Sequence, residues 1–512
     1  MKRSIFAHIL AALTVLSLAS CTSTSSNMPV SNPFPTTNTA PTTTGAAVLK
    51  QIVGVGDSLT AGEESDGLVG VTAPNPLGAG SANPFIVASQ PFGFWADLYN
   101  QVNGANAANN VLPLIQSPGI GTFLVLNAAG TSLISPQTSC SGLNASAFTV
   151  SGALSTRVNP NVTPLDVAVP GQLVHEALYQ TAPQGSCQSV SAGPGSLFQA
   201  ETTNFYPVMA NFPALTQVAA ARALRPTLTT VWLGHNDLLK YALSNGAFGP
   251  TPAASIQSDL TTIVQTLQQA GSQVAIGNLF DVLTAPLFVG LPNVPVTTAS
   301  PSDPIWNDLA ILSSGAITPS AGVAALVNNV LAQNNLTTGS YLTFTALPAI
   351  IAYIQSGGAG TVPTGLVAAN EALPAVFAAQ VQSTNNAYNT AISNVAQSTG
   401  ATLVDVHSMF VQVAAGTYAP ALIAPANFTT TFPSQVGVCC YLVPFGGLTS
   451  YDMLHPSYTG YALIANVWIA AINAKFGTSI APVNVATYNA ADPYAPNSPV
   501  YGASHMRYGG AR

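Results

Sequence analysis

Ser58 is the first residue of the chain whose type and setting could support chemistry. It follows the short apolar run 52–55 and closes the turn Gly56-Asp57-Ser58. The run predicts a buried strand, and the turn places Ser58 just beyond its carboxyl end, where open α/β sheets bind ligands. A serine there is a nucleophile if a base lies within hydrogen-bond reach. The alternative is that Asp57 and Ser58 only cap the following helix, since both residue types are preferred as caps.

His455 is the best-placed candidate base. It lies three residues after Asp452, in the segment 452–457 just before a predicted helix. An aspartate at this spacing in a turn can fold back and accept the ring N–H, which fixes the tautomer that a serine's general base needs. The alternative is a capped helix start in which the histidine has no chemical role.

The other histidines have less suitable neighbours. His407 is the competing base, but it alternates with Asp405 along or just beyond a predicted strand, a spacing that is poor for direct pairing. His175 and His235 have carboxylates only one or two residues away in the chain, and such side chains do not face one another easily. We therefore expect Asp452 and His455 to form the acid–base pair.

Three short segments resemble sequence blocks of the GDSL/SGNH hydrolases and occur in that family's order. They are residues 56–59 (Gly-Asp-Ser-Leu), 234–237 (Gly-His-Asn-Asp) and 452–456 (Asp-Met-Leu-His-Pro). Each block alone is a weak signal, but the three together are specific. The resemblance covers roughly residues 46–476.

The family's remaining block, usually Asn-x-Ala-x-x-Gly, has two candidate matches. Residues 166–171 fit it with Asp166 in place of Asn and Gly171 at the final position. The rival is 127–130, whose Gly130 comes two residues early. We favour Gly171.

The resemblance implies a role for each matching residue. Ser58 would be the nucleophile, His455 the general base and then acid, and Asp452 the group that orients His455. The oxyanion hole would combine the backbone N–H groups of Ser58 and Gly171 with the side-chain amide of Asn236. This chemistry needs no metal and no organic cofactor. The implied fold is α/β: a flavodoxin-like three-layer α/β/α sandwich with a central parallel sheet and long insertions.

Alternating strands and helices would position these residues. The apolar runs predict strands at 52–55, 165–169, 226–233, 274–279 and 402–406. The periodic segments predict helices at 92–102, 172–180, 213–224, 255–270, 366–398 and 458–476. Strands that alternate with helices over this length predict a parallel sheet covered on both faces.

We assign residues 46–476 to the hydrolase domain and 477–512 to a loose C-terminal tail. Insertions are expected at about 63–91, 103–163, 181–205 and 282–362. The last is rich in Ala, Leu and Pro, and two interpretations stay open for it. It is a helical subdomain that only covers the core, or it is a lid or acyl-binding wall.

The N-terminus predicts export and lipid anchoring. Residues 1–20 combine two basic residues with an apolar stretch of signal-peptide length. The sequence Leu-Ala-Ser before Cys21 resembles a bacterial lipobox, which makes Cys21 the expected lipidation site; an incidental thiol is the alternative. Residues 21–45 form a tether rich in Ser, Thr and Pro, too polar to fold alone. Because residue 22 is Thr rather than Asp, outer-membrane anchoring is favoured.

Four cysteines remain in the mature chain: Cys140, Cys187, Cys439 and Cys440. Export makes disulfides plausible, and four cysteines allow three pairings that sequence cannot separate. We favour Cys140–Cys187 within one insertion, which would leave Cys439 and Cys440 as a vicinal pair or as free buried thiols. No metal-site spacing involves these residues.

Composition limits the partners. Only 5% of residues are charged and the net charge is −7, so nucleic acid is not an expected partner. We expect an exported, lipid-anchored serine ester hydrolase whose substrates are acyl lipids or other hydrophobic esters. The alternatives are a carbohydrate O-acetyl esterase on the same scaffold and a non-catalytic surface-binding lipoprotein. The sequence leaves the oligomeric state open.

Overall fold

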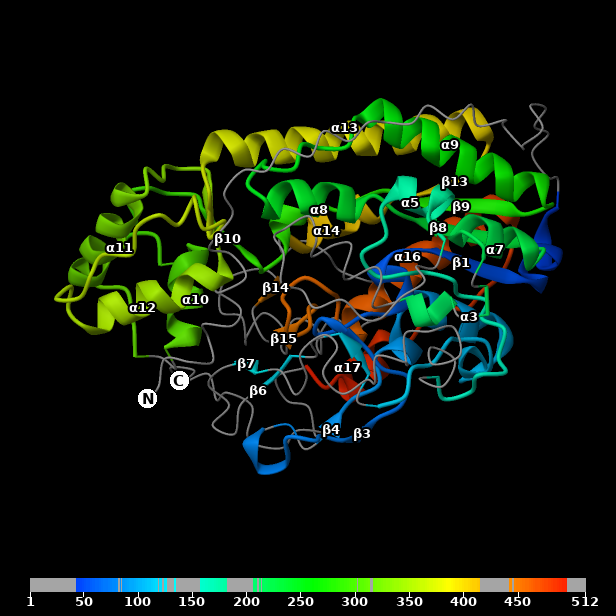
Figure 1. The fold of residues 1–512 in the computed structure, drawn as a ribbon, viewed down its shortest axis with the longest axis horizontal. Helices are drawn as coiled ribbons and strands as arrows, with labels where there is room; N and C mark the ends of the chain where they lie inside the picture. The colour runs from blue at the N-terminus through cyan, green and yellow to red at the C-terminus, as the bar shows by residue number, and fades with distance from the viewer. Residues whose placement is uncertain are drawn as a thin grey trace.

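A three-layer arrangement of helix, sheet and helix forms the body of the protein in the computed structural model (Figure 1). The described residues are 43–494, with gaps at 82, 84, 118, 122–123, 127–132, 135–156, 182–205, 210, 213, 302, 314–315, 415–441 and 444–445. The cysteines at 21, 140, 187, 439 and 440 lie outside the described residues, as do Gly130 and the N-terminal segment 1–42.

The central sheet is parallel and has the order β1-β8-β9-β13. Its strands are β1 (Ile52–Gly56), β8 (Leu228–Trp232), β9 (Gln273–Gly277) and β13 (Thr402–Val404). Residues 165–169 run beside the free edge of β1, where Gly54 N donates to Leu165 O and Val167 N donates to Gly54 O. With this segment the order along the chain is 2-1-3-4-5, the flavodoxin-like arrangement. The predicted fold class is confirmed.

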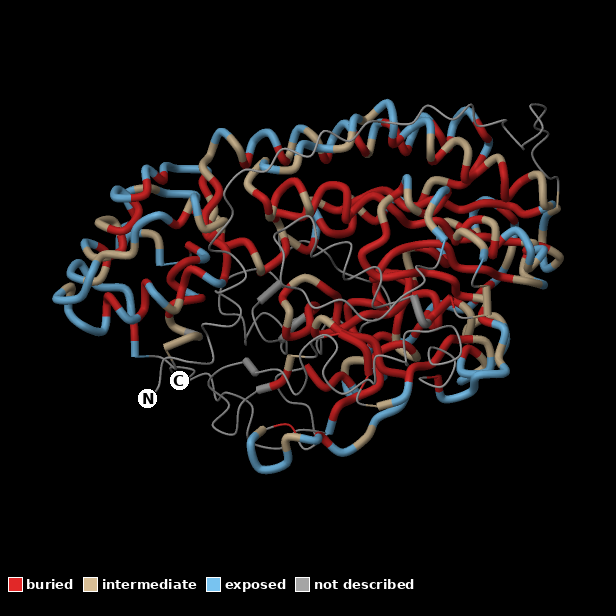
Figure 2. The backbone as a smooth tube through the Cα atoms, in the orientation of Figure 1, coloured by how far each residue is buried: buried red, intermediate tan, exposed pale blue. Residues whose placement is uncertain are grey.

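Helices cover both faces of this sheet. One face carries α5 (Val174–Tyr179), α7 (Gln217–Ala223), α9 (Ala253–Gln269) and α13 (Ala375–Thr399). The other carries α3 (Phe94–Asn103) and α16 (Tyr458–Phe476), with α14 (Val406–Ala414) against α16. The outward sides of α9 and α13 are exposed, whereas the strands between the layers are buried (Figure 2). The predicted helix 366–398 begins only at Ala375, because Ala372 and Leu373 pair with a strand instead.

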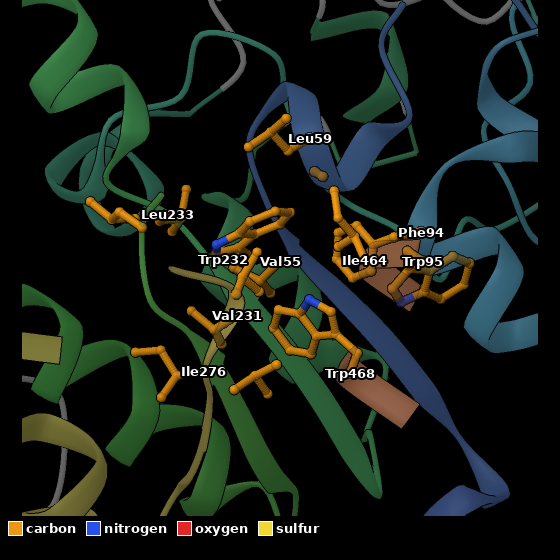
Figure 3. Close-up of a cluster of buried hydrophobic side chains, with 14 of the residues drawn as sticks. Val55, Leu59, Phe94, Trp95, Val231, Trp232, Leu233, Ile276, Ile464 and Trp468 are labelled. Carbon is orange, nitrogen blue, oxygen red and sulfur yellow. The ribbon is translucent and has the colours of Figure 1, made fainter. Parts of the chain in front are cut away.

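Large aromatic side chains fill the layer between the sheet and helices α3 and α16 (Figure 3). The ring of Phe94 packs against Trp232 and Trp468, with centroid distances of 5.2 and 5.1 Å. Gly277 of β9 leaves room for both indoles, since a Cβ there would lie 2.6 Å from Trp232 and 2.8 Å from Trp468. Close packing of this kind fixes the sheet, whose strand β1 precedes Ser58, relative to α16, which follows Asp452 and His455.

The insertion after β9 forms a smaller unit with its own apolar core, at one end of the molecule (Figure 1). Its antiparallel sheet has the order β10-β11-β12. The unit contains β10 (Phe288–Leu291), α10 (Pro304–Leu312), α11 (Ala321–Gln333), β11 (Ser340–Thr343), α12 (Leu347–Gln355) and β12 (Ala372–Leu373). The insertion is thus a mixed unit with a sheet as well as helices.

The loops contain short strands of two residues each. They are β2 (Gly67–Leu68), β3 (Ala73–Pro74), β4 (Phe85–Ile86), β5 (Ile120–Gly121), β6 (Val125–Leu126), β7 (Leu133–Ile134), β14 (Leu442–Val443) and β15 (Gly446–Gly447). In the described part of the chain, no helix is both long and apolar enough to cross a membrane.

Residues 477–494 pack against the domain, although the sequence predicts a loose tail there. Helix α17 (Val485–Ala491) contacts α16. The buried Asp492 carboxylate accepts hydrogen bonds from the backbone N–H and the hydroxyl of Thr459, at 2.9 and 2.6 Å. A polar, Ala-rich sequence gave no apolar pattern from which these contacts could be predicted.

Candidate active site

Ser58 begins a one-turn helix, α2 (Ser58–Ala61), directly beyond β1. The cap of that helix is Asp57, whose Oδ1 accepts from Leu59 N at 3.1 Å, so Ser58 is not needed as the cap. The turn requires Gly56, because a Cβ there would lie 2.0 Å from Thr60 Oγ1. The fold therefore presents the Ser58 hydroxyl from a tight strand-to-helix turn at the carboxyl edge of the sheet.

The structure brings Asp452 and His455 together in a hydrogen-bonded turn before α16. Asp452 Oδ2 lies 2.7 Å from His455 Nδ1, and Oδ1 accepts from the backbone N–H groups of Leu454 and His455 at 2.8 Å. The turn is closed by Ser450 N, which donates to His455 O. Burial opposes the charge of Asp452, but His455 and these donors outweigh it and hold its pKa below the usual value.

The loop after α2 connects Ser58 to this turn. Glu63 N donates to Ser58 O at 3.0 Å, and Asp66 N donates to Asp452 Oδ2 at 2.7 Å. The Glu63 carboxylate approaches the other ring nitrogen, with Oε2 3.9 Å from His455 Nε2. Burial favours the neutral ring, but Asp452 and Glu63 outweigh it and raise the pKa of His455 to about 10. Within the described residues, Ser58 Oγ and His455 form no hydrogen bond with each other.

The candidate oxyanion donors come from the loops on either side of β1. Gly171 ends the edge segment with φ +77°, a left-handed conformation that glycine adopts without strain. Asn236 lies in the first turn of α8 (His235–Leu243), and its Nδ2 donates to Gln172 O at 3.3 Å. The amide of Asn236 and the turn at Gly171 are therefore joined beside the strand that precedes Ser58.

The remaining histidines have other partners. His407 Nδ1 lies 3.1 Å from Leu279 O, while the Asp405 carboxylate accepts from Ser408 and Asn278. His175 pairs with Asp259 at 3.0 Å on the surface. His235 differs from expectation, because its Nδ1 lies 3.6 Å from Oδ2 of Asp57, a carboxylate that follows a different strand. The sequence analysis did not predict this pair, because its residues are far apart in the chain. For the same reason it did not predict that Glu63 and Asp66 lie near His455.

The described residues contain no group of three or more His, Cys, Asp or Glu side chains that could hold a metal ion. They contain Ser58, just beyond the first strand, and the Asp452–His455 pair. The loop that follows Ser58 contacts this pair, because Asp66 N donates to Asp452 Oδ2. On a parallel sheet of this order, that combination defines a serine hydrolase of the α/β type.

Residues 52–468 match the family GDSL-like Lipase/Acylhydrolase, and the chain belongs to this family of serine hydrolases acting on esters. The resemblance noted in three short segments is thereby confirmed for the family. A search among curated proteins found no match to the chain.

Met453 ties the turn of Asp452 and His455 to the insertion. Its backbone adopts φ +62°, its side chain is buried in the apolar core of the insertion, and its carbonyl accepts from Leu287 N at 3.1 Å. One of the two residues between Asp452 and His455 is thus anchored in a different unit of the fold.

Met453→Ala should therefore impair both stability and turnover. Loss of the buried side chain should cost about 2–5 kcal/mol of unfolding free energy. Loss of the anchor should lower kcat by up to ~10²-fold, the effect of a small misplacement of reacting groups. Met409→Ala is the matched control, since Met409 is buried in the main core. It should lose similar stability and keep kcat; an equal loss of kcat in both variants would refute the anchoring role.

Several carboxyl groups are buried so deeply that burial raises their pKa values. Burial raises the pKa of Asp308 to about 8 and that of Asp166 to about 7. It also raises the pKa values of Glu64 and Asp97 well above the usual range. The unfolded chain would titrate these groups near pH ~4, so between about pH 4 and 8 the folded protein binds more protons than the unfolded one.

The melting temperature should accordingly be highest near pH ~4–5 and fall toward pH ~8. A carboxyl with a raised pKa contributes stability below its unfolded pKa and loses it as the pH rises through the folded value. Asp452 acts in the opposite sense and limits stability at lower pH. Calorimetry across this range tests the sign, and Asp308→Asn should flatten the fall between about pH 6 and 8. A melting temperature that rises from pH 5 to 8 would contradict the assignment.

Proposed function

We propose that Ser58, His455 and Asp452 hydrolyse carboxylic esters through an acyl-enzyme. Ser58 Oγ attacks the ester carbonyl and passes its proton to His455 Nε2, and His455 returns that proton to the departing alcohol. Water then attacks the acyl-enzyme by the same route and releases the acid. The observation that carries the proposal is the 2.7 Å contact between Asp452 and His455, in a turn joined to the loop that follows Ser58.

The negative oxygen of the tetrahedral intermediate needs donors that are already in place. We assign this role to the backbone N–H groups of Ser58 and Gly171 and to the Asn236 amide. Support comes from the position of the two loops beside β1 and from the hydrogen bond between Asn236 and Gln172.

The proposed substrates are acyl lipids or other hydrophobic esters. Support comes from the insertion, whose apolar core includes Met453 of the Asp452–His455 turn and so lies against the proposed site. A carbohydrate O-acetyl esterase stays the second candidate, because a surface rich in amides and hydroxyls with few charges suits glycans.

We further propose that the protein is exported and held at the outer membrane by a lipid on Cys21. The basic and apolar residues 1–20 and the tether 21–45 support this assignment. This anchor would make the membrane a partner and would hold the enzyme close to the lipid esters of the bilayer.

A labelling experiment with a chain-length series tests the activity. An organophosphorus fluoride reacts with activated serines, so it should attach once per chain, and peptide mass spectrometry should locate it on Ser58. p-Nitrophenyl esters from acetate to palmitate should show an optimum at medium or long chains if acyl lipids are the substrates. An optimum at acetate would favour the deacetylase. No label and no hydrolysis by the folded protein would favour the non-catalytic binding lipoprotein.

A further inference from the structure

The His455 imidazole lies between two carboxylates. Asp452 Oδ2 contacts Nδ1 at 2.7 Å, and Glu63 Oε2 lies 3.9 Å from Nε2. The Glu63 side chain is fully buried, and that of His455 is only 8% exposed. Water therefore screens the second contact weakly, and Glu63 is the strongest attraction for the protonated ring after Asp452.

The two contacts have opposite consequences for a general base. A carboxylate at Nδ1 selects the tautomer whose Nε2 lone pair can accept the serine proton. A carboxylate on the Nε2 side stabilises a proton on that same nitrogen, which removes the lone pair. In the described residues, moreover, no hydrogen bond joins Ser58 Oγ to His455.

We propose that Glu63 is a positioning residue that holds His455 in a protonated, idle form and thereby sets the pH above which the base becomes available. The proposal rests on the function assigned to Ser58 and His455. It adds a second carboxylate, outside the triad, that restrains the base rather than activating it.

The other charged groups around the pair are consistent with this role. Asp66, in the same loop as Glu63, adds a smaller attraction for the protonated ring. Tyr461 of α16 donates its hydroxyl to Glu63 O at 2.7 Å and fixes the loop. Burial and the nearby carboxylates, Glu64 and Glu63 foremost, hold the pKa of this tyrosine well above its usual range, so it stays neutral.

Glu64 provides a matched control. It is the next residue and is equally buried, but its carboxyl interacts with Asp492 and Tyr494 rather than with the ring of His455. Replacement of either glutamate by glutamine removes one buried carboxyl from the same loop. Only one of the two changes removes the group that faces Nε2.

The test compares Glu63→Gln and Glu64→Gln in the full-length protein. With six histidines in the chain, ¹³C-labelled imidazoles allow the titration of His455 to be followed by NMR. Glu63→Gln should lower the pKa of His455 by at least ~1 pH unit and move the acidic limb of the kcat/KM profile toward lower pH by the same amount. At a pH on that limb, kcat/KM should therefore rise about tenfold. Glu64→Gln should leave both in place. An unchanged titration of His455 in folded Glu63→Gln would overturn the proposal.

The NMR titration separates this inference from the proposed function, because it does not depend on activity. If Ser58→Ala hydrolyses esters as fast as the wild type, the function is wrong whatever Glu63 does to the ring. If Glu63→Gln does not fold, Glu63→Asp keeps the charge but withdraws it by one methylene. It should lower the pKa of His455 by a smaller amount, and no decrease at all would again contradict the role.

Discussion

Ser58→Ala should lower kcat for medium-chain p-nitrophenyl esters by about 10⁶-fold, to the rate left by binding and the oxyanion donors alone. The reason is chemical: no acyl-enzyme forms without the hydroxyl, and His455 has no proton to accept. The fold should be unaffected, because Asp57 rather than Ser58 supplies the capping hydrogen bond of α2. Stopped-flow and steady-state assays measure the loss, and circular dichroism with a thermal scan verifies the fold.

Ser398→Ala is the matched control for that experiment. Ser398 lies near the end of α13, and its hydroxyl donates to two backbone oxygens of its own helix, Asn394 O at 2.7 Å and Val395 O at 3.3 Å. It should keep the activity of the wild type. A Ser58→Ala protein that retains more than about one hundredth of the wild-type kcat would mean that another group is the nucleophile.

The fold could be predicted because its signals are local. The run 52–55 is β-branched and ends in a glycine turn, and the comparable runs at 226–233, 274–279 and 402–406 each overlap a strand of the sheet. The pairing of Asp452 with His455 was predictable for the same reason, since three residues in a turn leave little freedom. The proposed partnership of these residues with Ser58 had to come from family resemblance, because spacing carries no information across most of the chain.

The rest of the site could not be predicted because its contacts are not local. Asp66 and Asp452 are 386 residues apart, and the contact is a backbone N–H, which every residue type except proline offers. Glu63 reaches His455 across a similar separation. A fully buried glutamate in a loop-rich segment of sequence is indistinguishable from an exposed one until the fold is known.

The role of the insertion also could not be predicted from the sequence. Its composition allowed either a cover for the core or a wall for an acyl chain, and its strands of two to four residues are too short for a reliable pattern. The burial of Met453 in its core links the insertion to the turn of Asp452 and His455. The packing of Met453 shows where the insertion contacts the candidate site, which the composition of the insertion could not show.

Asp452→Asn should lower kcat by about 10⁴-fold while the protein stays folded. Asp452 accepts at both oxygens: Oδ1 takes the N–H groups of Leu454 and His455, and Oδ2 takes Asp66 N and faces the His455 ring. An amide has only one acceptor oxygen. If that oxygen serves the backbone, the NH₂ group faces Nδ1, and the ring turns to the tautomer with its proton on Nε2.

That tautomer cannot accept the proton of Ser58, so the loss should appear in kcat rather than in KM. The amide should also lower the pKa of His455 from about 10, because the largest of the carboxylate attractions on its ring is gone. Asp405→Asn is the matched control, since Asp405 also has a lowered pKa and accepts from Ser408 and Asn278, but it has no contact with His455. It should keep kcat. If the kcat of Asp452→Asn lies within tenfold of the wild-type value, the backbone of the turn alone orients His455. The Asp452 carboxylate would then serve only to hold the loop at Asp66.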